Sequence, residues 1–134
     1  MPQEHSIGII VFNQDKWLII KYIGGHWGFS KGHKEEGEEP LETARRELFE
    51  ETGIKAFYIV KDFQEKEEYF FKKEGKTVHK EVIYFLAETP ETEAKLSEEH
   101  TEYKWLDYQQ AMNLLTFKET KELLKKAHDY LVRH

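Results

Sequence analysis

The chain of 134 residues is long enough for one domain with a real core and too short for two of ordinary size, so we expect a single domain over residues 1–134. Its formal net charge of −6 argues against extended nucleic-acid binding, which relies on a basic surface. Because the chain has no cysteine, disulfides, thiol catalysis and cysteine-zinc sites are excluded.

The opening segment, Met1–His5, lacks the basic and apolar regions of a signal peptide. No apolar run approaches the length that spans a membrane. We therefore expect no membrane association and a cytoplasmic location. The hydrophobic fraction of 39% is sufficient for a folded core.

The N-terminal part of the chain predicts a hairpin followed by a short strand. Residues 6–12 and 16–22 are compact apolar runs, and the Asn-Gln-Asp sequence at 13–15 supplies turn residues between them. After a pair of glycines, residues 26–30 indicate a short strand that leads into residues 31–33.

Residues 41–52 predict a helix, since a proline precedes them and a glycine follows them. A rotation of about 100° per residue places Glu47, Glu50 and Glu51 on one face of that helix. Three carboxylates on one face repel each other. The arrangement indicates either a solvated acidic patch or a site for a hard divalent cation.

The apolar residues of this helix are expected about a quarter turn round from the carboxylates. They are Leu41, Ala44 and Leu48. The helix can therefore pack on a sheet and still present its acids to a cleft.

The middle of the chain predicts further strands. Residues 55–63 form a run rich in β-forming residues, and residues 67–72 pair with residues 77–88 in a second hairpin. Residues 90–97 are a polar connection, after which the alternation in residues 101–107 predicts another strand.

Two helices are expected at the end of the chain, over residues 108–115 and 118–132. The second carries an apolar stripe suited to core packing, formed by Leu123, Leu124, Ala127 and Leu131. Strands before and after a central helix, closed by C-terminal helices, indicate the α/β class with a mixed β-sheet sandwiched between helices.

Nine residues within the 23 positions from Gly32 to Ile54 form a spaced pattern. It reads Gly32, five residues, Glu38, seven residues, Arg46-Glu47-Leu48, one residue, Glu50-Glu51, one residue, Gly53-Ile54. This pattern resembles the Nudix box of the Nudix hydrolases at every defined position. The resemblance implies the Nudix α/β/α fold and the hydrolysis of a nucleoside diphosphate linked to another group.

The same resemblance implies a Mg²⁺ cofactor, with Mn²⁺ as an alternative, held by Glu47, Glu50 and Glu51. Magnesium prefers oxygen ligands and bridges to substrate phosphates while keeping several waters. Glu50 and Glu51 are also expected to act in catalysis, together with Arg46. Arg46 is interpreted as a counter-charge that orients a carboxylate such as Glu38; the alternative is an exposed salt bridge that contributes little.

Segments outside the box resemble the asymmetrical diadenosine tetraphosphate hydrolases. They are residues 26–33, 80–86, 96–106 and 115–118. One departure is Ser30, where many members have proline before the lysine, so this loop is expected to be less rigid. The resemblance implies attack of a metal-activated water on diadenosine tetraphosphate, giving ATP and AMP.

This second resemblance also implies substrate contacts. Lys31 and Lys80 would contact the phosphate chain, and Tyr69 and Phe117 would sandwich an adenine. An ammonium is a compact counter-charge for phosphate, and stacking contributes about 1 to 3 kcal/mol per base. The alternatives are ordinary strand packing for Tyr69 and a cap on the core for Phe117.

Glu99 is a further candidate for catalysis, because a carboxylate from a distant loop could accept a proton from the attacking water or complete the metal shell. The neighbouring Glu98 is the alternative. His33 and His100 could assist phosphate binding or serve the structure. The seven histidines show no metal-ligand spacing.

Two other functions stay open. The first is another Nudix pyrophosphohydrolase activity, on a nucleoside triphosphate or a 5′-triphosphate RNA end. The second is a non-catalytic module that senses a nucleotide, which would be expected to have lost box carboxylates, whereas all three are present. The expected partner is a dinucleoside polyphosphate or another nucleotide, and the sequence predicts no particular oligomeric state.

Overall fold

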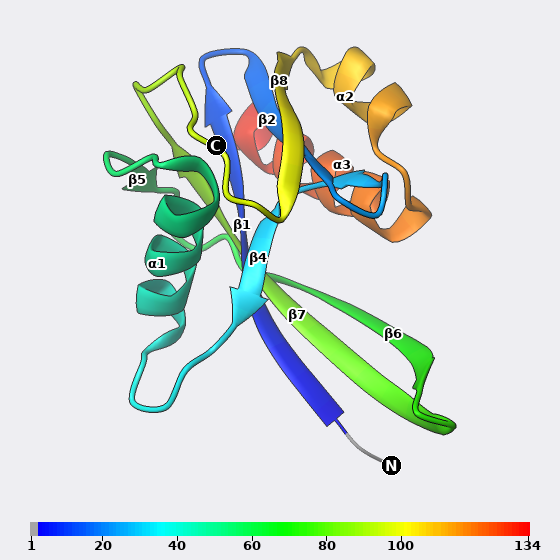
Figure 1. The fold of residues 1–134 in the computed structure, drawn as a ribbon. Coiled ribbons are helices and arrows are strands. Elements are labelled where there is room, and N and C mark those ends of the chain that lie inside the picture. Colours follow the sequence, from blue (N-terminus) through cyan, green and yellow to red (C-terminus); the bar gives the residue numbers. More distant parts are fainter. Residues whose placement is uncertain (1–2) are drawn as a thin grey trace.

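The structure, a computed structural model, describes residues 3–134 and shows a mixed sheet with helices on both sides (Figure 1). Met1 and Pro2 of the opening segment lie outside the described residues. The elements in chain order are β1 (Gln3–Asn13), β2 (Lys16–Tyr22), β3 (Trp27–Gly28), β4 (Ser30–His33), α1 (Pro40–Thr52), β5 (Tyr58–Ile59), β6 (Glu65–Lys73), β7 (Lys76–Glu88), β8 (His100–Leu106), α2 (Tyr108–Leu114) and α3 (Lys118–Arg133). Within this part of the chain, no helix has both the length and the apolar character needed to cross a membrane.

Strand β1 lies at the centre of the sheet and has several partners. It runs parallel to β7 from the pair Gln3↔His79 to the pair Phe12↔Glu88. Its end forms the antiparallel hairpin with β2, and its middle pairs antiparallel with β4. Beyond these, β2 pairs with β3 and β8, and β7 pairs with β5 and β6.

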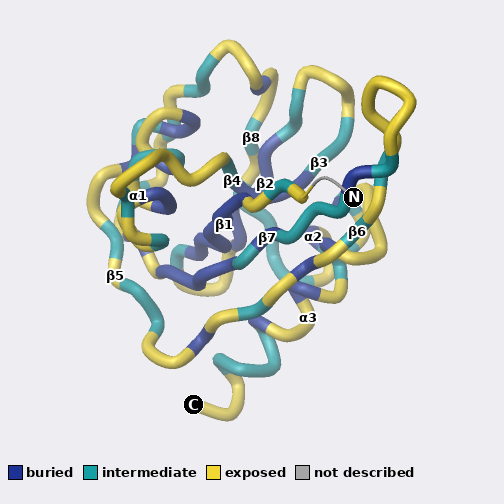
Figure 2. Tube along the Cα trace, turned by 90° about the horizontal axis from the view of Figure 1, so that it is seen from below, coloured by how far each residue is buried: buried dark blue, intermediate teal, exposed yellow. Residues whose placement is uncertain are grey.

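Because side chains alternate along a strand, β1 contributes to a hydrophobic cluster on each face of the sheet. Ile7, Ile9 and Val11 belong to one cluster, and Ile10 and Phe12 belong to the other. The first cluster receives Ala44 and Leu48 from α1, and the second receives Ala111, Leu123, Leu124 and Ala127 from α2 and α3. Figure 2 shows the buried stretches at the centre of the molecule, where β1 and β2 lie, with exposed loops around them.

Most predicted elements are confirmed. Both hairpins form, and α1 begins one residue earlier than expected and ends at Thr52. The strand expected over 101–107 is β8, and the two C-terminal helices differ from the expected ranges by one residue at their ends. The mixed sheet between helices is the predicted architecture.

The single strand expected over residues 26–30 is wrong. The segment divides into β3, which pairs with β2, and β4, which pairs with β1. Phe29 stands between them and is buried in the α2–α3 side of the core. The chain therefore changes its partner strand at the point where this ring anchors it.

The strand expected over residues 55–63 is also mostly wrong, since only Tyr58–Ile59 is a strand. The extended run ends where Asp62 adopts a left-handed φ of 68° and the Phe63 amide donates to the Val60 carbonyl. Phe63 turns into the core. This turn buries the Phe63 ring although the residue is not part of a strand.

The expected apolar stripe on α1 is correct for Ala44 and Leu48, which are buried, and wrong for Leu41. Leu41 is 43% exposed because it lies in the first turn of the helix, at the end of the stripe.

We predict that Leu48→Ala lowers the free energy of unfolding by about 2 to 5 kcal/mol, because it leaves a cavity in a closed core. Leu41→Ala, on the same helix, is the matched control and should change it by less than about 0.5 kcal/mol. Urea denaturation of the two variants measures both values. Equal losses would contradict the assignment of Leu48, and not Leu41, to the core.

Candidate active site

Local sequence signals fix both ends of α1. Pro40 occupies the first helical turn, and Glu39 and Glu42 form a capping box at the N-terminus. At the other end, Gly53 adopts a left-handed φ of 76°, and its amide donates to the Phe49 carbonyl at 2.8 Å. The carboxylates on this helix therefore have a well-defined direction.

Arg46 holds the acidic groups around α1 together. Its Nε donates to Glu38 Oε2 at 2.6 Å, which is the contact expected from the sequence. Its Nη1 donates to Glu47 at 2.9 Å and to Glu50 at 2.6 Å, and its Nη2 donates to the His33 carbonyl at 2.9 Å. The hydrogen bond from Arg46 lowers the pKa of Glu38 to about 2. One guanidinium thus joins the loop before α1 to two of its three box carboxylates.

Gly32 on β4 makes room for the Glu47 carboxylate. A Cβ atom at this position would overlap the Glu47 carboxyl group, so a side chain there would force this carboxylate out of its present place. Burial raises the pKa of Glu47, and the hydrogen bond from Arg46 opposes that rise. The glycine of the box is therefore a steric requirement for the acid.

Glu51 is the most enclosed of the three box carboxylates, with an exposed fraction of 3%. The Ser30 hydroxyl and the Lys31 amide, the latter at 3.1 Å, both donate to its Oε1. On the other side, His100 Nε2 lies 3.6 Å from Glu51 Oε2. Burial raises the pKa of Glu51 to about 8, with a further contribution from the charge of Glu47.

Glu99 faces the box more closely than its neighbour Glu98 does. Burial is the main cause of the raised pKa values of Glu47 and Glu51, and the charge of Glu99 is a smaller cause that also raises them. The Glu99 carbonyl accepts a hydrogen bond from the Ile23 amide at 2.9 Å, which fixes the loop beside β2. This geometry supports Glu99 as the distal acid.

The box carboxylates have the donor chemistry of a divalent-metal site, since all their ligand atoms are oxygens. In the present arrangement Arg46 supplies the positive charge between Glu47 and Glu50. A metal ion would take over this role with Glu47, Glu50 and Glu51 as ligands.

Within residues 3–134, three potential ligand atoms lie within 4.8 Å of one another only at Glu68, His79 and Glu81. This trio lies on the β6–β7 hairpin. Lys66 Nζ is 3.0 Å from Glu68 and 3.8 Å from Glu81, so a lysine already neutralises these acids.

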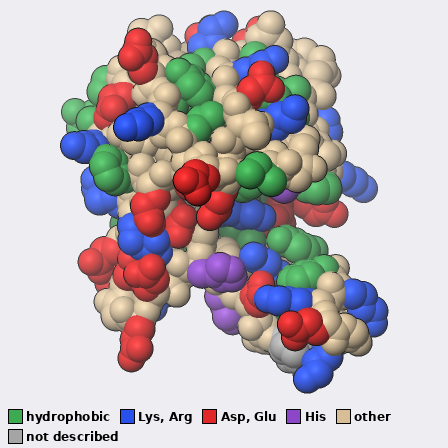
Figure 3. Space-filling view, in the orientation of Figure 1, with side chains coloured by type: hydrophobic (Ala, Val, Ile, Leu, Met, Phe, Trp, Pro, Cys, Tyr) green, Lys and Arg blue, Asp and Glu red, His purple; other side chains and the backbone are tan. Residues whose placement is uncertain are grey.

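A cavity of about 480 Å³ has Lys31, whose amide donates to Glu51 of α1, among its lining residues. Its walls are mostly aromatic, and its lining residues include Tyr22, His26, Trp27, Phe29, Lys31, Glu67, Tyr69, Tyr84 and Phe117. The structure thus brings three of the four expected substrate-binding residues together: Lys31, Tyr69 and Phe117. Figure 3 shows a notch between the projecting β6–β7 arm and the rest of the molecule, with acidic side chains over α1 beside it.

Lys31 connects the cavity to the acidic helix. Its backbone amide contacts Glu51, and its ammonium lies 3.5 Å from the Tyr69 hydroxyl and 5.7 Å from the centre of that ring. A lysine at this junction is suited to a phosphate chain that runs from the cavity to the carboxylates.

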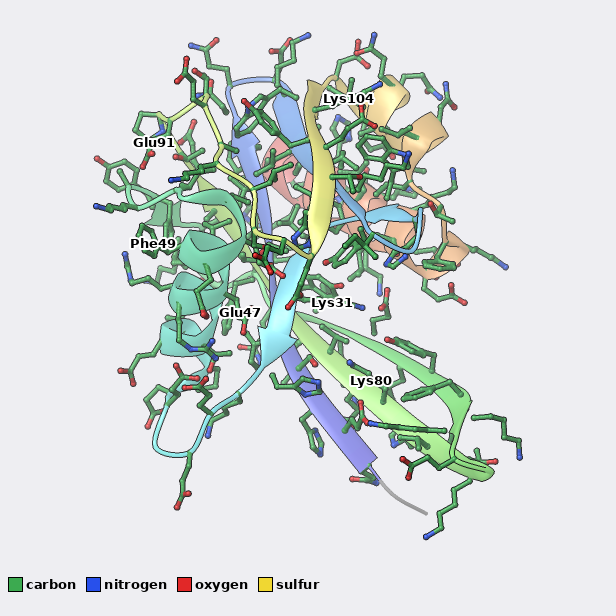
Figure 4. All side chains as sticks on the ribbon, viewed as in Figure 1. Lys31, Glu47, Phe49, Lys80, Glu91 and Lys104 are labelled. Carbon is green, nitrogen blue, oxygen red and sulfur yellow. The ribbon has the colours of Figure 1, made fainter. Side chains whose placement is uncertain are left out.

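Lys80 is the expected substrate-binding residue that does not line the cavity. It lies on the projecting part of β7, below Lys31 in the view of Figure 4. Its ammonium is 3.8 Å from Glu4 Oε1. Lys80 pairs with Tyr69 across the hairpin, so its charge acts close to the cavity without forming its wall.

Sequence reasoning missed two buried groups at the site: the Ser30 hydroxyl as a partner of Glu51, and Glu67 in the cavity wall. His100, for which a structural role was one of two alternatives, is buried beside Glu51. The signal for Glu67 was present, because it precedes Tyr69 by two residues and so shares its face of the strand. Ser30, the departure from the family pattern, adds a hydrogen bond that proline has no hydroxyl to make.

We predict that the metal-free protein loses stability as the pH rises from 4.5 to about 8. The pKa of Glu51 is raised by burial from 4.5 to about 8, so across this window the folded state keeps a proton that the unfolded state releases. That stabilising contribution is complete below pH 4.5 and is lost as the pH rises through 8. Urea denaturation in the presence of a chelator, compared with Glu51→Gln, isolates the effect. Identical pH dependence of the two proteins would contradict it.

Comparisons with known proteins identify the family. The NUDIX domain model matches residues 2–127. The chain is 43% identical to the mouse asymmetrical bis(5′-nucleosyl)-tetraphosphatase, with 94% of each chain covered. It is 27% identical to an RNA pyrophosphohydrolase of Bartonella bacilliformis, with 97% of this chain and 92% of the relative covered.

Among solved structures, the binary complex of the Caenorhabditis elegans Ap4A hydrolase matches with a TM-score of 0.80, 27% identity and full coverage of both chains. The match confirms the fold expected from the sequence. Helix α1, together with Arg46 and Gly32, therefore lies in the Nudix fold that the sequence pattern implied. The chain belongs to the NUDIX family and is a pyrophosphohydrolase.

Proposed function

We propose that the protein hydrolyses diadenosine tetraphosphate to ATP and AMP in a reaction that depends on Mg²⁺, with Mn²⁺ as a substitute. The observation that carries the proposal is the junction at Lys31, where an aromatic cavity and a carboxylate face meet at one residue. The similarity to the mouse tetraphosphatase supports the same substrate.

In this proposal the adenine of the substrate enters the cavity between Tyr69 and Phe117. Phe117 is half exposed, and its ring lies 5.3 Å from that of His26, so it can adjust to a stacked base. The phosphate chain then passes the Lys31 ammonium, which stabilises the charge that grows on the phosphate oxygens. Lys80 acts from the neighbouring strand through its charge.

The carboxylates face the reacting phosphorus. Glu47, Glu50 and Glu51 would hold the divalent metal, which would neutralise phosphate charge and lower the pKa of a water ligand. Glu99 accepts the proton of the attacking water. The water oxygen forms the new bond to phosphorus as one bridging P–O bond breaks, and the leaving phosphate departs as part of ATP or AMP.

Arg46 pairs with Glu47 and Glu50, whose charge a bound metal ion would also offset, and it keeps the loop before α1 in place through Glu38. We infer that its contribution to catalysis is this positioning. The expected setting is cytoplasmic, where nucleotide substrates and Mg²⁺ are available.

The second candidate is removal of pyrophosphate from a 5′-triphosphate RNA end or a nucleoside triphosphate, favoured by the similarity to the Bartonella RNA pyrophosphohydrolase. A cavity for one base with a single lysine suits a terminal nucleotide, and the net charge of −6 does not favour a long nucleic-acid contact.

The deciding experiment is incubation with diadenosine tetraphosphate and Mg²⁺ in oxygen-18 water, followed by mass analysis of the separated nucleotides. We expect ATP and AMP, with the label in one of them. Pyrophosphate from a triphosphorylated substrate, without turnover of the dinucleotide, would favour the second candidate. Tight binding of the dinucleotide without any product would favour a sensing module. Glu51→Gln should abolish turnover while the circular dichroism spectrum stays unchanged.

We predict that Glu99→Gln lowers kcat by about 100-fold or more, because a positioned general base contributes roughly 10²- to 10⁴-fold. Glu98→Gln is the matched control, since Glu98 is the adjacent exposed acid. It should retain a rate within about twofold of the wild type. Steady-state kinetics measures both variants, and a larger loss in Glu98→Gln would reassign the base.

We predict that Tyr69→Ala raises KM by about 5- to 100-fold, since stacking contributes about 1 to 3 kcal/mol per base. Phe70→Ala is the control, because Phe70 is the next residue, is 61% exposed and stacks on His79. It should leave KM unchanged. A similar rise in both variants would mean that Tyr69 supports the hairpin and does not stack on a base.

A further inference from the structure

Glu67 is a buried acid whose carboxyl group is not fully paired. It is 8% exposed, and within residues 3–134 its Oε2 atom has no hydrogen-bond partner. An unpaired buried polar group destabilises a fold, so such a group needs a physical reason. None of the catalytic roles above uses it.

The fold directs Glu67 into the aromatic cavity. It lies on β6 opposite Val82 of β7, and Tyr69 follows two residues later on the same face of the strand. Both residues line the cavity, whose other walls come from β2, β3, β4, β7 and the start of α3. Glu67 therefore stands in the cavity wall beside the ring that would stack on a base.

Lys31 does not neutralise this acid. Its ammonium points to the Tyr69 hydroxyl at 3.5 Å, and in the part of the chain that the structure describes no ion pair or hydrogen bond joins Lys31 to Glu67. The lysine charge lowers the pKa of Glu67, but the effect of burial is larger and the pKa is raised overall. The acid is thus free for a ligand that offers a hydrogen-bond donor.

A stacked purine presents such a donor at its edge. Adenine carries an exocyclic 6-amino group with two N–H donors, whereas hypoxanthine and guanine carry a carbonyl acceptor at the same position. An amino group can donate to a carboxyl oxygen whether that carboxyl is neutral or ionised. A carbonyl placed there would instead oppose an ionised carboxylate.

We propose that Glu67 is a specificity-determining residue whose free oxygen accepts a hydrogen bond from the 6-amino group of the adenine held between Tyr69 and Phe117. This inference rests on the proposed function in one respect: it takes the aromatic cavity as the site of the base. Stacking alone is tolerant of base identity, so the hydrogen bond supplies the selection.

The test compares AMP with purine riboside 5′-monophosphate, which has the same phosphate, sugar and ring but lacks the amino group. Isothermal titration calorimetry gives the dissociation constant of each for the wild type and two variants. The wild type should bind AMP at least about 10-fold more tightly, the usual effect of a hydrogen bond to a charged or buried acceptor.

Glu67→Met fills the same space without an acceptor, so it should bind the two nucleotides equally. Glu67→Gln keeps an acceptor oxygen and should retain the preference for AMP. Glu119→Gln, which changes the exposed acid in the same lining, should also retain it. Equal binding of both nucleotides by the wild type, no binding of AMP, tighter binding of GMP than of AMP, or a preserved preference in Glu67→Met would each overturn the inference.

Thermal denaturation separates this role from a structural one. Because Glu67→Met removes an unpaired buried acid, its Tm should rise by about 3 °C or more. A lowered Tm, together with an equal loss of affinity for both nucleotides, would show that Glu67 serves the fold and would overturn the inference.

The binding measurement needs no turnover, so the two proposals can fail separately. A preference for AMP that depends on Glu67, without hydrolysis of diadenosine tetraphosphate, would leave the inference standing and refute the proposed reaction. Hydrolysis of the dinucleotide without that preference would refute the inference alone.

Discussion

Electrostatic repulsion among the carboxylates of α1 is the constraint around which the site is organised. The helix brings three acids to one face, and the loop before it adds Glu38. Arg46 offsets this repulsion with a fork of donors that reaches Glu38, Glu47, Glu50 and a backbone carbonyl. A lysine, with a single nitrogen, could not bridge groups in so many directions. The loop, the helix and the neighbouring strand are held in one arrangement by this guanidinium.

The two halves of the site differ in their physical character. The carboxylate face needs positive charge, whereas the cavity needs a flat, apolar ligand with a hydrogen-bond donor at its edge. Lys31 lies at their boundary, with its amide on the acidic side and its ammonium on the aromatic side. A nucleotide combines an anionic chain with a flat base, so its chemistry changes along its length as the site changes. In the proposed reaction, this correspondence is what would orient the substrate.

Local sequence signals predicted those elements whose ends and faces are set by neighbouring residues. The acidic helix was found because Pro40 and Gly53 mark its ends and because residue spacing alone determines its face. Long-range packing decided the rest. The burial of Glu67 depends on how α3 covers β6. The approach of Glu99 to the box carboxylates depends on the path of a loop that lies far from them in the sequence. Phe63 misled the prediction, because its apolar side chain is buried by a turn and not by a strand.

The parallel pairing of β1 with β7 has a consequence for how the molecule folds. Its first pair joins Gln3 to His79. Forming this ladder therefore closes a loop that contains more than half of the chain, including α1. Loop-closure entropy opposes such non-local pairing and slows it, whereas α1 and the β6–β7 hairpin can form from local contacts. Helix α1 and the hairpin that carries Tyr69 thus depend on local contacts, whereas the other walls of the cavity come from distant elements. Lys31 on β4 and Tyr69 on β6 are joined through β1 and β7, so the site is complete only when this central ladder closes.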